Sequence, residues 1–404
     1  MRAALVLLLL GALAGEAPAA ALWQFEGRLG VGGEPADGVY HHLDGAGRKH
    51  LAISAQTVAA VWEDNRSGDP QVYVALKRHG QVDFSPPLQV SGGSEAYEPV
   101  IAALGGNRFA LAWEQDGAVH ARLLQDGSLS PSSRLSAAAA SHVSLASLGE
   151  RAYAAWRERR DGTWFLQVAE LRPSDSGGLA ADGVKSVEAE GTRTPVQFPS
   201  LAVNEAGLCI AWEDRRAGHT RLLVSHSADA ASAFDPPRHL NEFFSNRNEY
   251  DKGSGVTRVS LASFGADEIV AAWMDKRRGG SGYGIFAALG AEGGAMFGPN
   301  EKVHGEPGDT EPHYNPATAG NPAGHFVVAW DDFRHGDSDV WLSAYNDDLE
   351  WSEDFSPEVA SGAGEQTHPA VALDPAGGLH LLWIERARPD APSRLWYSYG
   401  APRP

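Results

Sequence analysis

Apolar and polar positions along the chain follow one pattern that recurs from end to end. Its clearest copy spans residues 325–345, HFVVAWDDFRHGDSDVWLSAY, where an apolar run ends in Ala-Trp and a second apolar run follows a polar turn that contains glycine. Two half-buried runs around such a turn predict a β-hairpin. Variants of this copy place a tryptophan at positions 62, 113, 156, 212, 273, 330 and 383. A recurrence of roughly fifty residues is typical of a repeat fold.

Each copy divides into four predicted strands. A first segment, such as 97–102, 197–202 or 367–372, precedes the strand that ends in Ala-Trp. A third segment follows, such as 72–76, 221–225 or 340–344, and a fourth opens with an aromatic residue and usually contains a proline. Four short strands per repeat make one blade of a β-propeller. We therefore predict an all-β chain built of four-stranded antiparallel blades.

The two ends of the repeat region complement each other. The last copy has three predicted strands before the sequence stops at Pro404, whereas residues 25–33, FEGRLGVGG, precede the first copy and resemble a fourth segment. Pairing of this N-terminal strand with the last blade would close the ring and remove its exposed edges. We predict seven blades in a single domain, residues 22–404. The alternative is six blades and an additional hairpin, because the second copy is short and degenerate.

Composition adds an expected location. Residues 1–21 combine Arg2, an apolar run over 3–14 and small residues around Pro18, which predicts a secretory signal peptide. We expect a secreted or periplasmic monomer without a membrane anchor. The formal net charge of −19 at pH 7 disfavours nucleic acid as a partner. Cys209 is the only cysteine in the sequence, and its apolar neighbours predict a small buried side chain that forms no disulfide.

The strongest local motif is an acid two residues after the tryptophan, with an arginine two residues further on. Residues two apart on a strand share a face, so the pair can form an ion pair. A ring of guanidinium groups could bind a carboxylate ligand. We favour an architectural role for the pairs, and likewise a core position for the tryptophans, because one asymmetric substrate needs different groups in different places. The pairs are Asp64/Arg66, Glu158/Arg160, Asp214/Arg216, Asp275/Arg277 and Asp332/Arg334; the second copy has Gln115 and Gly117, and the seventh has Glu385 and Ala387.

A second set of residues stands where each inner strand begins, and its members differ from blade to blade as a binding site requires. Its three histidines belong to blades one, three and seven, which do not all adjoin, and His41 and His42 point to opposite faces of one strand. We therefore predict no metal and no cofactor. The set comprises His50, Glu98, His142, Phe198, Arg258, Asn315 and His368.

The longest polar connections, 241–255 and 304–316, join blade four to five and blade five to six. Both lead from an outer strand to the next inner strand, which places them on the same rim as the turns at 275–280 and 332–339. Long loops on a rigid scaffold commonly carry function. The candidate ligand-binding residues are Arg247, Arg258, Arg277, Asp309, His313, Tyr314, Arg334 and His335.

The turn after the third strand of the fourth copy, VSHSADAASAFDPP, is similar to the Asp-box of bacterial neuraminidase repeats, Ser-x-Asp-x-Gly-x-x-Trp. Ser227, Asp229 and Phe234 match it, with Phe in place of Trp, whereas Ala231 stands in place of Gly. The blade pattern A-W-x-D-x-R-x-G also resembles the sialidase-like propellers of exported bacterial proteins.

This resemblance implies Asp-box turns on the face away from the active site. In active members it implies an arginine triad, a Tyr–Glu nucleophile pair and an aspartic acid. The chain departs from that pattern: GRLG at 27–30 does not match the Phe/Tyr-Arg-Ile-Pro motif that supplies one arginine. Such sialidases also have six blades. Glu249, Tyr250 and Asp251 are the loop residues that we nominate for catalysis.

We predict a sialidase-like, non-catalytic module that binds an extracellular glycan or protein through the rim of blades four to six. The alternative is a glycan-active enzyme, either an exo-sialidase-like hydrolase or a polysaccharide lyase. It requires Arg, Tyr/Glu and Asp side chains to converge in one deep pocket. We rank a protein–protein scaffold last. That role predicts an apolar patch on the rim, and the loops are polar apart from Phe243 and Phe244.

Overall fold

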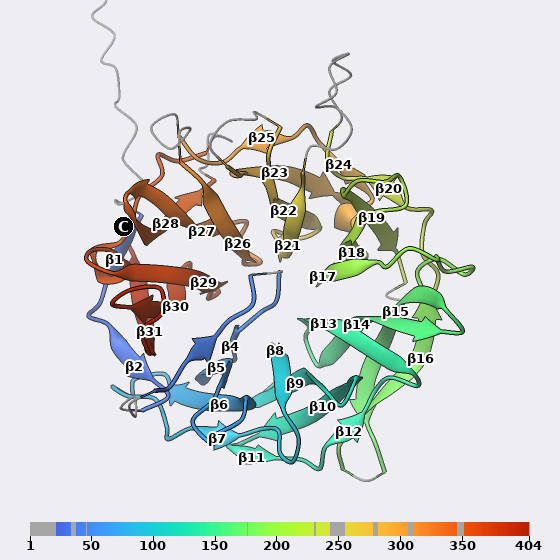
Figure 1. The fold of residues 1–404 in the computed structure, drawn as a ribbon, viewed down its shortest axis with the longest axis horizontal. Helices are drawn as coiled ribbons and strands as arrows, with labels where there is room; N and C mark the ends of the chain where they lie inside the picture. Colours follow the sequence, from blue (N-terminus) through green and yellow to red (C-terminus); the bar gives the residue numbers. More distant parts are fainter. Residues whose placement is uncertain are drawn as a thin grey trace, which may run out of the picture.

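The structure is a computed structural model, and it describes residues 22–33, 38–45, 47–175, 177–229, 232–242, 255–277, 282–305, 311–345 and 351–403. Seven antiparallel sheets surround a central axis (Figure 1). The prediction of a seven-bladed β-propeller is confirmed, and the degenerate second copy forms a blade of its own. The signal peptide predicted over residues 1–21 lies outside the described residues. Among the described residues, no helix has the length and apolar character needed to span a bilayer.

The first three blades follow one another from the N-terminal side of the chain. Blade one contains β3 (His41–His42), β4 (Leu51–Ile53), β5 (Thr57–Asp64), β6 (Gln71–Arg78) and β7 (Leu88–Gln89). Blade two contains β8 (Ala96–Leu104), β9 (Arg108–Gln115), β10 (Ala118–Gln125), β11 (Ser128–Leu129) and β12 (Ser133–Arg134). Blade three contains β13 (Ala139–Leu148), β14 (Arg151–Arg160), β15 (Thr163–Pro173) and β16 (Leu179–Ser186).

The next three blades keep the same order from the inner to the outer strand. Blade four contains β17 (Gln197–Asn204), β18 (Gly207–Asp214), β19 (Arg221–Ser227) and β20 (Arg238–His239). Blade five contains β21 (Thr257–Phe264), β22 (Glu268–Asp275), β23 (Gly284–Ala291), β24 (Met296–Phe297) and β25 (Glu301–Lys302). Blade six contains β26 (His313–Gly320), β27 (Phe326–His335) and β28 (Asp337–Ala344), with isolated bridges from Leu342 to Phe355 and from Tyr345 to Trp351 at its outer edge.

Blade seven is shared between the two ends of the chain. Its inner strands are β29 (Glu365–Leu373), β30 (Leu379–Arg386) and β31 (Ser393–Pro402). The outer position is filled by β1 (Trp23–Phe25) and β2 (Leu29–Val31), both antiparallel to β31. Ring closure by the N-terminal strand, predicted from the unmatched segment 25–33, is therefore confirmed.

The core lies between the blades. The seven repeated tryptophans are the largest fully buried side chains, which confirms that they are core residues. Each packs against the blade that precedes it in the ring: Trp62 lies with Leu382 and Tyr397 of blade seven, and Trp212 lies with Tyr153 of blade three. Cys209 is buried as predicted, and burial raises the pKa of its thiol to about 12. Burial of one large indole at every boundary makes adjacent blades interdependent.

The acid–arginine motif forms the expected ion pairs. In blade one the Trp62 indole N–H donates to Asp64 at 2.6 Å, and Arg66 Nη2 lies 2.5 Å from the same carboxylate oxygen. The acid is thus held by the tryptophan two residues before it and the arginine two residues after it. Blade two replaces the acid by Gln115, which accepts from the Trp113 indole at 3.0 Å and donates to the carbonyl oxygen of Ser94. Equivalent acid–arginine contacts occur in blades three to six, at Glu158/Arg160, Asp214/Arg216, Asp275/Arg277 and Asp332/Arg334.

Candidate functional site

Six inner strands carry the same irregularity close to their start. In blades two to seven the pairing between the first and second strands shifts register at one point, which is a β-bulge. One residue in each bulge has a left-handed backbone, with φ between 48° and 61°. The backbone of residues other than glycine is strained in this conformation. The six residues are Glu98, His142, Phe198, Arg258, Asn315 and His368, six of the seven positions predicted where the inner strands begin.

Buried carboxylates hold several of these bulges from the neighbouring blade. Each such acid directly follows a core tryptophan, one position before the acid of the ion-pair motif. Sequence analysis missed this role, although the signal, an acid after Trp in four copies, was present. The bonds run from the backbone N–H of Glu98 to Glu63 (3.2 Å), of His142 to Glu114 (2.6 Å), of Arg258 to Glu213 (2.9 Å) and of His368 to Asp331 (2.7 Å).

Residues 43–45 and 47–50 of blade one enter the centre of the ring, and we call this part of the chain the plug. Figure 1 shows it in blue, running inward to the tips of β21 and β26 and back to β4. Gly47 has φ +69°, and a Cβ there would clash with the carbonyl oxygen of Val259 in blade five. Arg48 is buried, and its Nε donates to the carbonyl oxygen of Val143 in blade three at 3.1 Å. The plug therefore crosses the channel and needs glycine where it touches the far wall.

Arg48 is the centre of a charged network at the inner end of the plug. Its guanidinium contacts the carboxylate of Asp44, Glu98 Oε2 at 2.7 Å and Glu114 Oε1 at 2.9 Å. Burial acts against ionisation of Glu98, but the Arg48 charge together with His42 and His50 outweighs it and lowers the pKa of Glu98 to about 2. Arg258 also approaches Asp44, at 3.4 Å. The network joins blades one, two and five.

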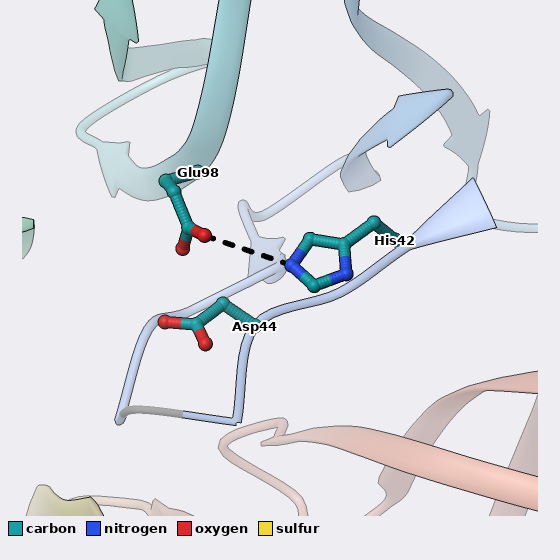
Figure 2. Close-up of side chains that lie close together, drawn as sticks. All are labelled: His42, Asp44 and Glu98. Atoms are coloured by element: carbon teal, nitrogen blue, oxygen red, sulfur yellow. Dashed lines mark ion pairs between the residues drawn. The ribbon is translucent and has the colours of Figure 1, made fainter. Parts of the chain in front are cut away.

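His42, Asp44 and Glu98 form the side of this network that is open to solvent. Figure 2 shows the three side chains facing one another, and His42 Nε2 lies 3.6 Å from Glu98 Oε1. Burial disfavours the charged form of His42, yet the carboxyl groups of Glu98 and Glu63 together more than compensate and raise the pKa of His42. One ligand atom from each residue lies within 4.8 Å of the others, so the group could hold a small cation. Arg48 contacts both carboxylates, however, and would compete for the same oxygen atoms.

The opposite side of the opening is aromatic and cationic. The rings of His142 and Phe198 stack at a centroid distance of 4.2 Å with an interplanar angle of 13°. The Arg258 guanidinium lies 4.0 Å from the centroid of the Phe198 ring, and 31% of its side chain is exposed. Burial and nearby charges lower the pKa of His142 to about 2 and that of His368 to about 3, so both are neutral at physiological pH. We call His42 and the six bulge residues together the mouth.

Carboxyl groups in and beside the mouth differ in their affinity for protons. Burial raises the pKa of Glu63 to about 7, whereas that of Glu98 lies at about 2. The two groups are close, since the Glu98 backbone N–H donates to Glu63. Burial also raises the pKa of Glu114. Near neutral pH the opening therefore offers a carboxylate and a group that can carry a proton side by side.

Most of the described rim candidates are engaged in the protein interior. Arg277 is held by Asp275, with 6% of its side chain exposed, and Arg334 is held by Asp332 and Asp354, with 7% exposed. His313 is buried and lies 3.0 Å from Asp332, and Tyr314 packs against Tyr283 and Phe333. His335 is 64% exposed and lies beside Asp339. Among the predicted ligand-binding residues that the structure describes, Arg258 alone lies in the mouth. The predicted residues Arg247, Asp309, Glu249, Tyr250 and Asp251 lie outside the described residues.

Two further predictions can be located. His41 and His42 point to different surroundings, as expected: His41 is buried and contacts Ser393 and Asp64. The segment compared with an Asp-box follows β19, and there the Ser227 hydroxyl donates to Asp229 at 3.2 Å. This turn lies on the face away from the mouth, because Ser227 pairs with Leu208 at the start of β18.

No protein-family model and no curated protein matches the sequence. Solved structures do match. A protein of unknown function from Dyadobacter fermentans has a TM-score of 0.56 at 11% identity, over 94% of this chain and 99% of that one. The α-L-arabinanase of Penicillium chrysogenum, complexed with arabinobiose, has a TM-score of 0.50 at 12% identity, over 93% and 98% of the two chains. At these identities the likeness shows the propeller fold alone.

A neuraminidase-like protein is also among the matching structures. The N10 protein of A/little yellow-shouldered bat/Guatemala/060/2010 has a TM-score of 0.46 at 6% identity, over 94% of this chain and 99% of that one. The propeller fold predicted from the sialidase-like resemblance is supported by the blades themselves. The specifically sialidase-like character stays a prediction.

Proposed function

We propose that the mouth is a non-catalytic binding site for a glycan. One observation carries the proposal. At six positions where glycine would remove backbone strain, the chain keeps six side chains that stand near the start of the inner strands, around the plug, and are almost all different. Strain that is retained around an opening is typical of a functional constraint. The proposed surface is thus the centre of the ring, whereas the sequence pointed to the rim of blades four to six.

The chemistry of the mouth suits a carbohydrate. The stacked rings of Phe198 and His142, with the Arg258 guanidinium over the Phe198 ring, supply an apolar aromatic edge that a sugar ring can contact. His42, Glu98 and Asn315 supply donors and acceptors around it, and the half-buried Arg258 can pair with a carboxylate on an acidic sugar. An apolar platform with a few convergent polar groups is the usual composition of a small-ligand site.

The first experiment measures retention of glycans by the mature chain, beginning near residue 22. The panel contains sialosides, acidic polysaccharides and neutral oligosaccharides, with arabinobiose included because the Penicillium arabinanase binds it. Mass spectrometry reads both retained and shortened glycans. Retention without shortening supports the proposal. If nothing on the panel is retained, the proposal fails and a protein ligand takes its place.

Two substitutions at Phe198 separate binding from folding. Phe198→Ala and Phe198→Gly both remove the aromatic ring, and each should weaken glycan binding by about tenfold or more. Because φ is +48° at this position, the glycine variant should be more stable than the alanine variant by about 1 kcal/mol. Arg172→Gln, on an exposed arginine of blade three, is the control that should leave binding unchanged. Unchanged binding in both Phe198 variants would contradict the proposal.

The second candidate is a glycan-active enzyme at the same opening. It is favoured by the neighbouring carboxyl groups of Glu63 and Glu98, whose pKa values of about 7 and about 2 suit a proton donor and a permanent carboxylate. Shortened glycans in the same assay would support it, and Glu63→Gln should then abolish shortening while retention persists. The loop residues Glu249, Tyr250 and Asp251 would be the next to substitute.

A further inference from the structure

A cavity lies in the channel on the other side of the plug from the mouth. Its volume is about 220 Å³, and all seven inner strands contribute to its wall. In blades two to seven the lining residues follow the bulge residue by three to five positions, so the cavity lies toward the opposite face of the ring. At the middle of these positions every blade has an alanine, which leaves the space open. These are Ala52, Ala102, Ala146, Ala202, Ala262, Ala319 and Ala372.

Lys49, the plug residue next to Arg48, is the one charged residue among the described residues that line this cavity. Its Nζ donates to the carbonyl oxygen of Thr318 at 2.6 Å and to the Thr318 hydroxyl at 3.3 Å. Within the described part of the chain, no carboxylate oxygen lies within 4.0 Å of Lys49 Nζ. The side chain is half-buried, so water reaches it. Burial lowers the pKa of Lys49 to about 7.

An amine in this position needs an explanation beyond packing. A cation surrounded by aliphatic residues and without a counter-ion loses its hydration and gains little in return. Hydrogen bonds to one threonine satisfy two of its three donors and none of its charge. A methionine would fill the same volume without that cost. An anion that enters from the open face would supply the missing charge, and the alanine ring would supply apolar contact.

We propose that this cavity binds a small aliphatic carboxylate, with its carboxylate on Lys49 Nζ and its hydrocarbon body against the ring of alanines. The site is separated from the mouth by the plug, and the proposal does not depend on glycan binding. It assigns Lys49 a ligand-binding role in addition to its contact with Thr318.

Calorimetric titration of the mature chain with hexanoate tests the proposal. At pH 6 hexanoate should bind with a stoichiometry of one, and hexanol, which has the same body without the charge, should bind about tenfold more weakly or not at all. Affinity for hexanoate should fall by about 100-fold between pH 6 and pH 9, because Lys49, with a pKa of about 7, loses its proton over this range. Equal binding of hexanol and hexanoate, or no binding of hexanoate, would overturn the proposal.

Variants assign the binding to Lys49. Lys49→Met keeps the length and apolar stem of the side chain and should abolish hexanoate binding. Lys49→Arg should retain it and remove its pH dependence, which keeps the test decisive if the methionine variant does not fold. Lys185→Met, on an exposed lysine, should bind like the parent protein. Loss of binding in Arg258→Gln with retention in Lys49→Met would place the carboxylate in the mouth and refute the proposal.

Discussion

At the scale of single residues, the acid that directly follows a core tryptophan has the largest structural effect. Asp331 is buried and accepts hydrogen bonds from the His368 backbone N–H at 2.7 Å and from the Asn315 side chain at 2.7 Å. It thereby joins blade six to blade seven and fixes two mouth residues. Burial raises the pKa of Asp331 to about 8. The contact between two blades therefore depends on a carboxyl group that is protonated at neutral pH.

This gives a pH dependence of stability with a definite sign. An aspartate in the unfolded chain has a pKa of about 3.9, so between about pH 4 and pH 8 the native state holds a proton that the unfolded state has lost. The contribution of Asp331 to the free energy of unfolding is complete below pH 4 and is lost as the pH rises through 8. Asp331→Asn should therefore lose less stability than the parent protein between pH 5 and pH 8.5.

Thermal or denaturant unfolding at the two pH values provides the measurement. Because Glu63, Glu114 and Lys49 titrate in both proteins, only the difference between parent and variant isolates Asp331. Asp390→Asn, on an acid whose side chain is 78% exposed, serves as the control and should follow the parent. If Asp331→Asn and the parent respond equally to pH, the carboxyl group is not protonated in the native state.

At the scale of elements, strand β1 closes the ring by covering the edge of the last blade. Strand β1 comes from the start of the described chain and pairs with β31 near its end, with Trp23 opposite Pro402. Trp23 is 6% exposed, and its indole N–H donates to the carbonyl oxygen of Gly377 at 2.9 Å. An unpaired β31 would leave an open sheet edge, which invites pairing with another chain.

Trp23→Ala should therefore destabilise the whole ring. Loss of a buried tryptophan typically costs about 3–5 kcal/mol, and the exposed edge should also promote association. Leu22→Ala, on an exposed side chain next to it, should change the free energy of unfolding by less than about 0.5 kcal/mol. Denaturant unfolding and size-exclusion chromatography provide the two readouts. Similar stabilities for the two variants would mean that β1 contributes little to closure.

At the scale of the whole molecule, net charge opposes the compact state. The formal net charge is −19, while the ion pairs of the blades and of the plug are mostly buried or half-buried. Salt screens chiefly the exposed charges. The Debye length, over which charges interact, falls from about 30 Å at 0.01 M salt to about 8 Å at 0.15 M. Added salt should weaken the general repulsion more than the internal pairs.

The melting temperature should accordingly rise when sodium chloride is raised from 10 mM to 150 mM at constant pH. Differential scanning calorimetry measures this directly. Sodium sulfate at equal ionic strength distinguishes screening from specific ion effects, because screening alone predicts equal shifts. A lower melting temperature in salt would show that exposed ion pairs, rather than net repulsion, dominate the electrostatics.

The candidate site was only partly predictable. The seven positions at the start of the inner strands could be chosen from the repeat, and six of them are the bulge residues of the mouth. The plug could not be foreseen, because its contacts join residues far apart in the sequence, such as Asp44 with Arg258 and Lys49 with Thr318. Nor could the repeat show that Arg277 and Arg334 are buried in ion pairs of the blades while Arg258 is only half-buried.

The sequence by itself determined the blades, their number, the tryptophan core and the closing strand. These follow from local alternation of apolar and polar residues and from a period that brings equivalent residues to equivalent places. Only the tertiary structure decided which side chains share the central channel and what charge they carry there. Ring closure sets which blades meet at the plug, and burial at that meeting point sets the pKa values of Lys49, Glu63, Glu98 and Asp331.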